Sequence, residues 1–150
     1  MLLEDSLDQF LIQKFDELPE QIIELSLIAQ KEGFRFINRL INEYQSGQNL
    51  FNEQGEALFG IQENEKIIAI GGINATEDIG IGRLRRFYVH PSYRCHGIGK
   101  FLLSIIEQHA KKHFVEIVLY TDTNRAATFY KNMGYCEINT PHSNFAKKIG

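Results

Sequence analysis

A chain of 150 residues can bury one hydrophobic core but is too short for two domains of ordinary size. Its hydrophobic content of 43% and charged content of 23% are ordinary for a soluble globular protein. The longest apolar run, residues 67–73, is far shorter than the ~20 residues that span a bilayer, so we expect a single domain over residues 1–150 that does not enter a membrane.

The first third of the chain predicts one strand followed by two helices. A short strand is expected over residues 10–15. Pro19 suits the first turn of a helix, and apolar residues then recur at helical spacing as far as Gly33. A second amphipathic helix presents apolar residues between positions 36 and 44 and stops before Gly47. The polar residues that follow indicate a loop.

The middle of the chain predicts three strands. Residues 57–62 and 66–73 form a pair of apolar segments joined by the polar turn 63–65. The next strand covers residues 82–90. It is ended by Pro91, which has no N–H group to donate to a neighbouring strand.

The last third predicts two helices and further strands. A helix is expected over residues 98–112, then a mostly apolar strand over 114–121 of the kind that is buried on both faces. Residues 124–133 form another helix, which ends at Gly134. The tail, residues 135–149, has room for two short strands. The order β-α-α-β-β-β-α-β-α-β, with one more strand possible, predicts a three-layer α/β domain with a mixed, mainly antiparallel sheet.

The N-terminus and the cysteines favour a cytoplasmic protein. Glu4, Asp5 and Asp8 stand where a secretory signal would have a basic segment before an apolar one. Cys95 and Cys136 are not in a CxxC arrangement, and two cysteines do not form a disulfide scaffold.

Charge is divided unevenly along the chain. Residues 1–80 contain 15 acidic and 5 basic side chains, whereas residues 81–150 contain 4 acidic and 11 basic ones. The basic half is suited to an anionic ligand. Its basic residues are scattered and lack an array of aromatic side chains, so we expect no nucleic-acid partner.

One short segment combines glycines, two cations and the start of a helix. It consists of Arg94, Cys95, His96, Gly97, Ile98, Gly99 and Lys100. Glycines allow backbone N–H groups to crowd around a bulky anion, and a helix N-terminus adds its positive dipole end. We therefore predict a phosphate cradle here. The spacing excludes a Walker A loop, which needs Gly where Arg94 stands. It also excludes a dinucleotide fingerprint, because Leu102 stands where Gly or Ala is required.

Two segments resemble those of the GNAT superfamily of acyl-CoA-dependent N-acyltransferases. Residues 86–99 resemble its signature Arg-x-x-Gly-x-Gly after a strand that ends in Val-His-Pro, with Cys95 where Gly is frequent. Residues 124–135 resemble its later segment, in which an Asn opens a helix and a Phe-Tyr pair precedes a Gly-aromatic turn. The resemblance is specific over residues 82–136.

The resemblance implies a donor site for acetyl-CoA. Residues 94–100 would bind the CoA pyrophosphate through backbone N–H groups. Tyr88 and Val89 would pair with the pantetheine arm, in a slot between strands that splay apart, and a backbone N–H near Val89 would polarise the thioester oxygen. Tyr130 would be the general acid that protonates the departing thiolate, and it would also contact the donor. The further donor contacts implied by the motif are Asn124 and Ala127; Asn124 would equally serve as a helix N-cap.

The acceptor side is less defined by the sequence. Many family members have a carboxylate base on the strand that corresponds to residues 82–89, and this chain has arginines there instead. His90, Tyr120 and Asp122 are conceivable bases. Because alternate residues of a strand share a face, Arg83 and Arg85 should point together and Arg86 away from them. That pair indicates an anionic acceptor. The alternative for this pair is a solvated or CoA-facing strand edge. A competing indication comes from the acidic N-terminal half, where Glu24, Glu32 and Glu43 could form a wall that attracts a polyamine or a lysine side chain.

We therefore expect an N-acetyltransferase that moves an acetyl group from acetyl-CoA to a primary amine of a small molecule or peptide within a ternary complex. A non-catalytic acyl-CoA sensor on the same fold is the alternative, and an O- or thiol-transferase is a third possibility. No metal site is expected, because His109 and His113 have helical spacing but no third ligand. Either a monomer or a homodimer is compatible with the sequence.

Overall fold

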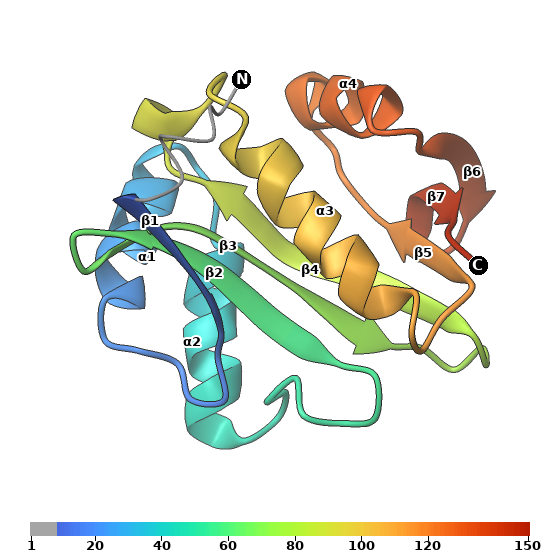
Figure 1. The fold of residues 1–150 in the computed structure, drawn as a ribbon, viewed down its shortest axis with the longest axis horizontal. Helices are drawn as coiled ribbons and strands as arrows, with labels where there is room; N and C mark the ends of the chain where they lie inside the picture. Colours follow the sequence, from blue (N-terminus) through green and yellow to red (C-terminus); the bar gives the residue numbers. More distant parts are fainter. Residues whose placement is uncertain (1–8) are drawn as a thin grey trace.

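A mixed sheet of seven strands forms the centre of the computed structural model, which describes residues 9–150 (Figure 1). Glu4, Asp5 and Asp8, on which the expectation about a signal segment depends, lie outside the described residues. The strand order is β1-β2-β3-β4-β5-β7-β6. The strands are β1 (Phe10–Lys14), β2 (Ala57–Glu63), β3 (Lys66–Ala75), β4 (Ile81–Val89), β5 (Glu116–Leu119), β6 (Cys136–Thr140) and β7 (Ser143–Lys148). The helices are α1 (Ile22–Lys31), α2 (Phe36–Ser46), α3 (Ile98–Ala110) and α4 (Asn124–Asn132).

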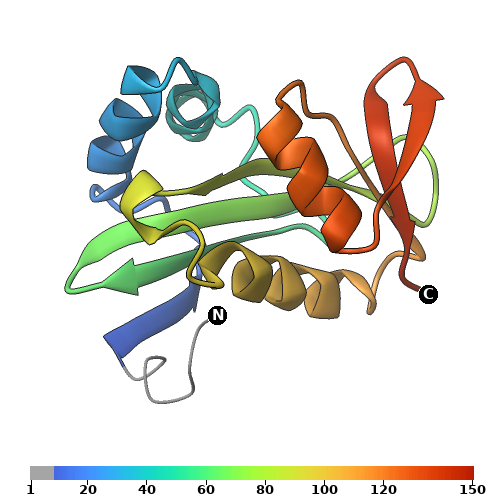
Figure 2. The same cartoon turned by 90° about the horizontal axis from the view of Figure 1, so that it is seen from above.

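Helices cover both faces of the sheet, as Figure 2 shows with α1 and α2 on one side and α3 on the other. Helices α1, α2 and α3 each bury apolar residues at the spacing of a helical turn. Ile37 and Leu40 of α2 join a core cluster under α1 and α2, and Leu102 and Ile106 of α3 join a second cluster on the opposite face, to which α4 also contributes Tyr130. The predicted three-layer α/β fold is confirmed, including the additional last strand. No helix within residues 9–150 is long and apolar enough to span a bilayer.

The strand after α3 is shorter than predicted. It covers residues 116–119 instead of 114–121. At its start, the N–H of Phe114 still donates to the carbonyl of Ala110 at 2.7 Å, so the chain has not yet left the helix end. After Leu119 the chain leaves the sheet and leads to α4. Apolar character alone does not report where a strand stops pairing.

Strands β4 and β5 separate soon after they meet. They pair in parallel only where Ile81, Gly82 and Arg83 lie opposite residues 116–118. Beyond Arg83, β4 continues along β3, while β5 continues along β7. The expected splay is therefore present, and it opens a slot between the C-terminal ends of two neighbouring strands.

A β-bulge in β4 changes which side chains share a face. The register between β3 and β4 shifts between Ile70 and Gly72, and Arg86 adopts a positive φ of 60°. Arg86 therefore faces α2, where it donates a 2.9 Å hydrogen bond to Glu43. The prediction that Arg86 points away from Arg83 and Arg85 is wrong, because strict alternation holds only for an unbulged strand.

Gly72, which pairs with Arg85 beside the bulge, lies too close to an aromatic ring for any side chain. A Cβ at this position would lie 2.5 Å from Cε1 of Phe51 and 3.1 Å from the carbonyl oxygen of Ala57. We expect Gly72→Ala to lower the free energy of unfolding by about 1–3 kcal/mol through overpacking. Urea unfolding measures the change. Gly99→Ala is the control, because a Cβ there meets its neighbours at 3.4 Å or more. An unchanged midpoint for Gly72→Ala would contradict the packing described.

Candidate functional site

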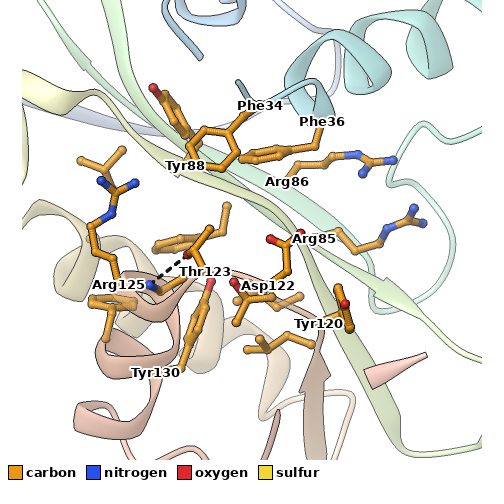
Figure 3. Close-up of a pocket in the computed structure, with 18 of the residues that line it drawn as sticks. Phe34, Phe36, Arg85, Arg86, Tyr88, Tyr120, Asp122, Thr123, Arg125 and Tyr130 are labelled. Atoms are coloured by element: carbon orange, nitrogen blue, oxygen red, sulfur yellow. Dashed lines mark hydrogen bonds between the residues drawn. The ribbon is translucent and has the colours of Figure 1, made fainter. Parts of the chain in front are cut away.

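The slot between β4 and β5 widens into a groove of about 1460 Å³ (Figure 3). One wall is β4 from Arg83 to Val89. The other is formed by residues 119–123, which follow β5, together with α4. The start of α3 closes one end of the groove. Phe34, Phe36 and Arg39, which come from α2 and the segment before it, line its remaining side.

The predicted phosphate cradle lies at the N-terminus of α3. Gly97 precedes the helix with a φ of 82°, and Cys95 also has a positive φ, of 64°. These values turn the chain sharply, so that the N–H groups of the first helical turn face the groove end. Of the predicted cradle residues, the structure places five on the groove surface: Arg94, Cys95, Gly97, Gly99 and Lys100. His96 and Ile98 do not line the groove, and Ile98 is buried in the core instead.

The side chain of Arg94 is occupied by an ion pair. Its two terminal nitrogens donate to the two carboxylate oxygens of Glu32, each at 2.7 Å, and its Nε donates to the carbonyl of Val89 at 3.1 Å. The guanidinium carbon lies 5.3 Å from the centroid of the Tyr88 ring, and the Tyr88 hydroxyl also donates to Glu32. The charge of Arg94 is therefore largely balanced by Glu32, and only its backbone is left for the predicted cradle.

The same contacts set the ionisation of Glu32. Hydrogen bonding to Arg94 lowers the pKa of Glu32 from 4.5 to about 2. A carboxyl group with a depressed pKa stabilises the folded state above its unfolded pKa, and this contribution is lost as the pH falls towards its folded pKa. We expect Glu32→Gln to be less stable than the unchanged chain at neutral pH, and the difference to shrink as the pH falls from 4.5 to about 2. Urea unfolding at a series of pH values measures it, and a pH-independent difference would contradict it.

The backbone of Val89 faces the groove. Val89 lies opposite Ala69 of β3, and the N–H of the next residue, His90, donates to the carbonyl of Ile68 at 2.8 Å. Because hydrogen-bonding directions alternate along an antiparallel strand, the N–H and carbonyl of Val89 point away from β3. The bond from Arg94 to the Val89 carbonyl agrees with this direction. The Val89 N–H is therefore directed towards the open side of β4.

Tyr130 projects from α4 with its hydroxyl towards the groove (Figure 3). The residue is only 6% exposed, and its ring packs edge-on against Phe87, Phe129 and Tyr135. Burial raises the pKa of Tyr130 above its ordinary value, so the phenol keeps its proton at neutral pH.

The start of α4 differs from the prediction. Thr123, rather than Asn124, is the N-cap, because its side chain accepts a hydrogen bond from the N–H of Ala126 at 3.2 Å. Asn124 is the first helical residue and is exposed. Neither Asn124 nor Ala127 lines the groove, whereas Arg125 and Ala126 do. Residue type alone did not distinguish Thr123 from Asn124, since both are good N-caps.

The candidate bases and substrate residues are also placed. His90 does not line the groove, and its Nδ1 accepts from the N–H of Ser92 at 3.0 Å. Tyr120 and Asp122 line the groove, as do Arg83 and Arg85. Among the groove residues that the sequence did not predict are Phe34, Phe36, Arg39 and Arg125. Their apolar or charged character carries no signal that α2 and α4 would meet β4 across a slot.

Comparison with known proteins agrees with this architecture. A family model described as the acetyltransferase (GNAT) domain matches residues 54–137. Over 85 residues the chain is 36% identical to the Xenopus tropicalis protein Probable N-acetyltransferase 14, a match that covers 55% of this chain and 41% of that protein. This chain therefore spans less than half the length of that relative.

Solved structures share the fold over almost the whole chain. A structure from Exiguobacterium sp. 255-15, assigned as an acetyltransferase, is 26% identical with a TM-score of 0.82, covering 93% of each chain. A GNAT acetyltransferase from Staphylococcus aureus Mu50 is 19% identical with a TM-score of 0.74, covering 93% of this chain and 100% of its own; this likeness shows the fold alone. The architecture is that of an acyltransferase domain. With the match over residues 54–137, the chain belongs to the GNAT acetyltransferase family.

Proposed function

We propose that the chain transfers an acetyl group from acetyl-CoA to the primary amine of a small molecule or peptide, by direct attack within a ternary complex. One observation carries this proposal. A single groove joins the glycine-containing start of α3, the outward N–H of Val89 and the hydroxyl of Tyr130. These are an anion site, an oxyanion donor and a proton donor, which are the three groups that a thioester donor needs.

Residues along this groove hold the acetyl-CoA donor. Backbone N–H groups at residues 94–100 bind the pyrophosphate of acetyl-CoA, and Tyr88 and Val89 flank its pantetheine arm. The absence of a Cβ at Gly99 fits this group, because any longer side chain there would enter the space beside Val89 and Phe129. The Val89 N–H donates to the thioester oxygen as negative charge develops on it.

Tyr130 protonates the leaving group. The amine nitrogen attacks the thioester carbonyl, the C–S bond breaks, and the sulfur takes the phenolic proton of Tyr130. The buried site that raises the pKa of Tyr130 disfavours a free thiolate as well, so the proton transfer remains balanced. The proton of the attacking amine must go elsewhere. Within residues 9–150, Asp122 is the one carboxylate that lines the groove, and we assign it this role, directly or through water.

Release of free thiol from acetyl-CoA, measured over a panel of amino acids, polyamines, aminoglycosides and N-terminal peptides, tests the proposal. Turnover with any amine, confirmed by the mass of the acetylated product, supports it. The alternative is a non-catalytic acyl-CoA sensor, which is favoured by the absence of a carboxylate on β4. Calorimetric binding of acetyl-CoA without turnover over the whole panel would favour that alternative.

A further inference from the structure

An arginine cluster lines the side of the groove formed by β4 and α2. It consists of Arg39, Arg83, Arg85 and Arg86. Figure 3 shows the side chains of Arg85 and Arg86 extending in the same direction from the bulged strand. Asp122 is the one carboxylate of the described residues that lines the groove, and Glu43, Glu53 and Glu56 line a smaller pocket that also includes Arg85. On the groove surface itself, cations therefore outnumber acids.

Two of the four arginines already have protein partners. Arg86 pairs with Glu43 at 2.9 Å, with side chains that are 8% and 15% exposed. One terminal nitrogen of Arg83 donates to the carbonyl of His142 at 2.8 Å and to the hydroxyl of Ser143 at 2.6 Å, which fastens the turn between β6 and β7. Both contacts are structural, and within the cluster they leave Arg85 and Arg39 as the cations available to a ligand; Arg35, at the N-cap of α2, also lines the groove.

Arg85 is held in an unfavourable environment. The side chain is partly buried, and within residues 9–150 it forms neither a hydrogen bond nor an ion pair. Burial lowers the pKa of Arg85, as do the charges of Arg86, Arg83 and Arg39, while Glu43 acts in the opposite direction. A cation that is partly dehydrated beside like charges gains strongly from an added anion.

The competing acidic wall does not form. Glu32 is paired with Arg94, and Glu43 is paired with Arg86. Glu24 does not line the groove. The acids that were expected to attract a polyamine or a lysine are thus neutralised or placed elsewhere, and the cationic surface remains.

We propose that the acceptor carries a carboxylate or phosphate in addition to its amine, and that Arg85, with Arg39 of α2, binds this anionic group. The proposal rests on the acetyltransferase function proposed above and specifies its substrate class. A guanidinium group binds the paired oxygens of a carboxylate or phosphate in a bidentate manner. This contact orients the amine at the other end of the acceptor towards the thioester. Arg85 is thus a specificity-determining residue.

Matched acceptor pairs test the proposal. One pair is 4-aminobutyrate and its amide, and the other is phosphoethanolamine and ethanolamine, each compared at equal concentrations of unprotonated amine. We expect the anionic member of at least one pair to have the higher kcat/KM, and the better pair distinguishes carboxylate from phosphate. Arg85→Gln should raise the KM for that member about tenfold or more. It should leave the KM for the neutral member of the pair and the KM for acetyl-CoA unchanged.

The controls separate charge at the site from overall charge. Lys111→Gln removes an exposed cation that does not line the groove. It should leave the KM for both members of each pair unchanged. Arg85→Lys keeps the charge without the bidentate geometry. Its KM for the anionic member should lie between those of the unchanged chain and Arg85→Gln. Equal kcat/KM within both pairs, or equal losses for both members in Arg85→Gln, would overturn the proposal.

The proposed function can fail independently. If no amine is acetylated, the same pairs are titrated by calorimetry into protein saturated with CoA. Tighter binding of an anionic member, lost in Arg85→Gln, supports the anion site without the reaction. Equal binding of both members, or no binding of either, overturns the anion site as well.

Discussion

Tyr130→Phe is expected to lower kcat by about 10²–10⁴-fold, because general acid catalysis by a positioned side chain contributes about that much. The substitution removes one oxygen and keeps the ring that packs against Phe87 and Phe129. The affinity for acetyl-CoA, measured by calorimetry, should stay within about twofold, because removing a group that acts only in the transition state leaves ground-state binding intact. Single-turnover measurements of thiol release would show the loss in the chemical step.

The pH dependence provides an independent check on this residue. Burial raises the pKa of Tyr130 above 10.0, so the phenol stays protonated through the neutral range. Activity should therefore decline through ionisation of Tyr130 only above pH 10.0. Tyr130→Leu serves as a comparison, because it also removes the packing of the ring. If Tyr130→Phe retained full activity, Tyr130 would be a packing residue and the proton would come from solvent.

Gly99→Leu is expected to weaken acetyl-CoA binding by about tenfold to a hundredfold, since overpacking costs about 1–3 kcal/mol. A Cβ at Gly99 would lie 3.4 Å from Cγ2 of Val89 and 3.5 Å from the ring of Phe129, so a methyl group is tolerated but a longer side chain enters the groove. Gly99 lies within α3, where Leu has a higher helix propensity by roughly 1 kcal/mol. The helix should therefore not be weakened while donor binding is lost.

Because helix stability and donor binding are expected to change in opposite directions in Gly99→Leu, the two effects can be distinguished. Gly99→Ala is the matched control, which gains helix propensity without filling the groove. Calorimetry with acetyl-CoA and urea unfolding are measured on both variants. Unchanged donor affinity in Gly99→Leu would mean that the donor does not pass between Val89 and Phe129. Reduced stability in Gly99→Leu alone would attribute the loss to packing in α3 instead.

Local patterns predicted most of the architecture. Glycine at the ends of α2 and α4 and the apolar stripe of α3 placed these helices within a few residues of their bounds, because caps and stripes are properties of neighbouring positions. The two segments 86–99 and 124–135, together with the order of strands and helices, were sufficient for the family. The pairing partner of each strand was less accessible, and the early end of β5 shows why: pairing depends on a second segment.

The sequence predicted the backbone part of the groove and several of its side chains, among them Tyr130, Arg85 and Asp122, but not how the charged side chains are directed and paired. The start of α3 and the position of Val89 follow from glycines and from strand direction. The bulge at Arg86 depends on the register with β3, so the directions of the arginine side chains could not follow from alternation. The pairing of Glu32 with Arg94 joins residues 62 positions apart, and nothing in either local segment indicates it. Long-range ion pairs thus decided which charges remain available.

Because β4 and β5 separate early, each of them has part of an edge inside the sheet that pairs with no other strand. An unpaired strand border on the outside of a protein is a template for aggregation with other chains. Here the borders face each other across a groove that is lined by residues of α2 and α4, so a strand from another molecule has no straight approach to them. The splay of β4 and β5 in this chain therefore leaves backbone hydrogen-bonding groups within reach of a slender molecule, while α2 and α4 restrict the approach of another protein chain.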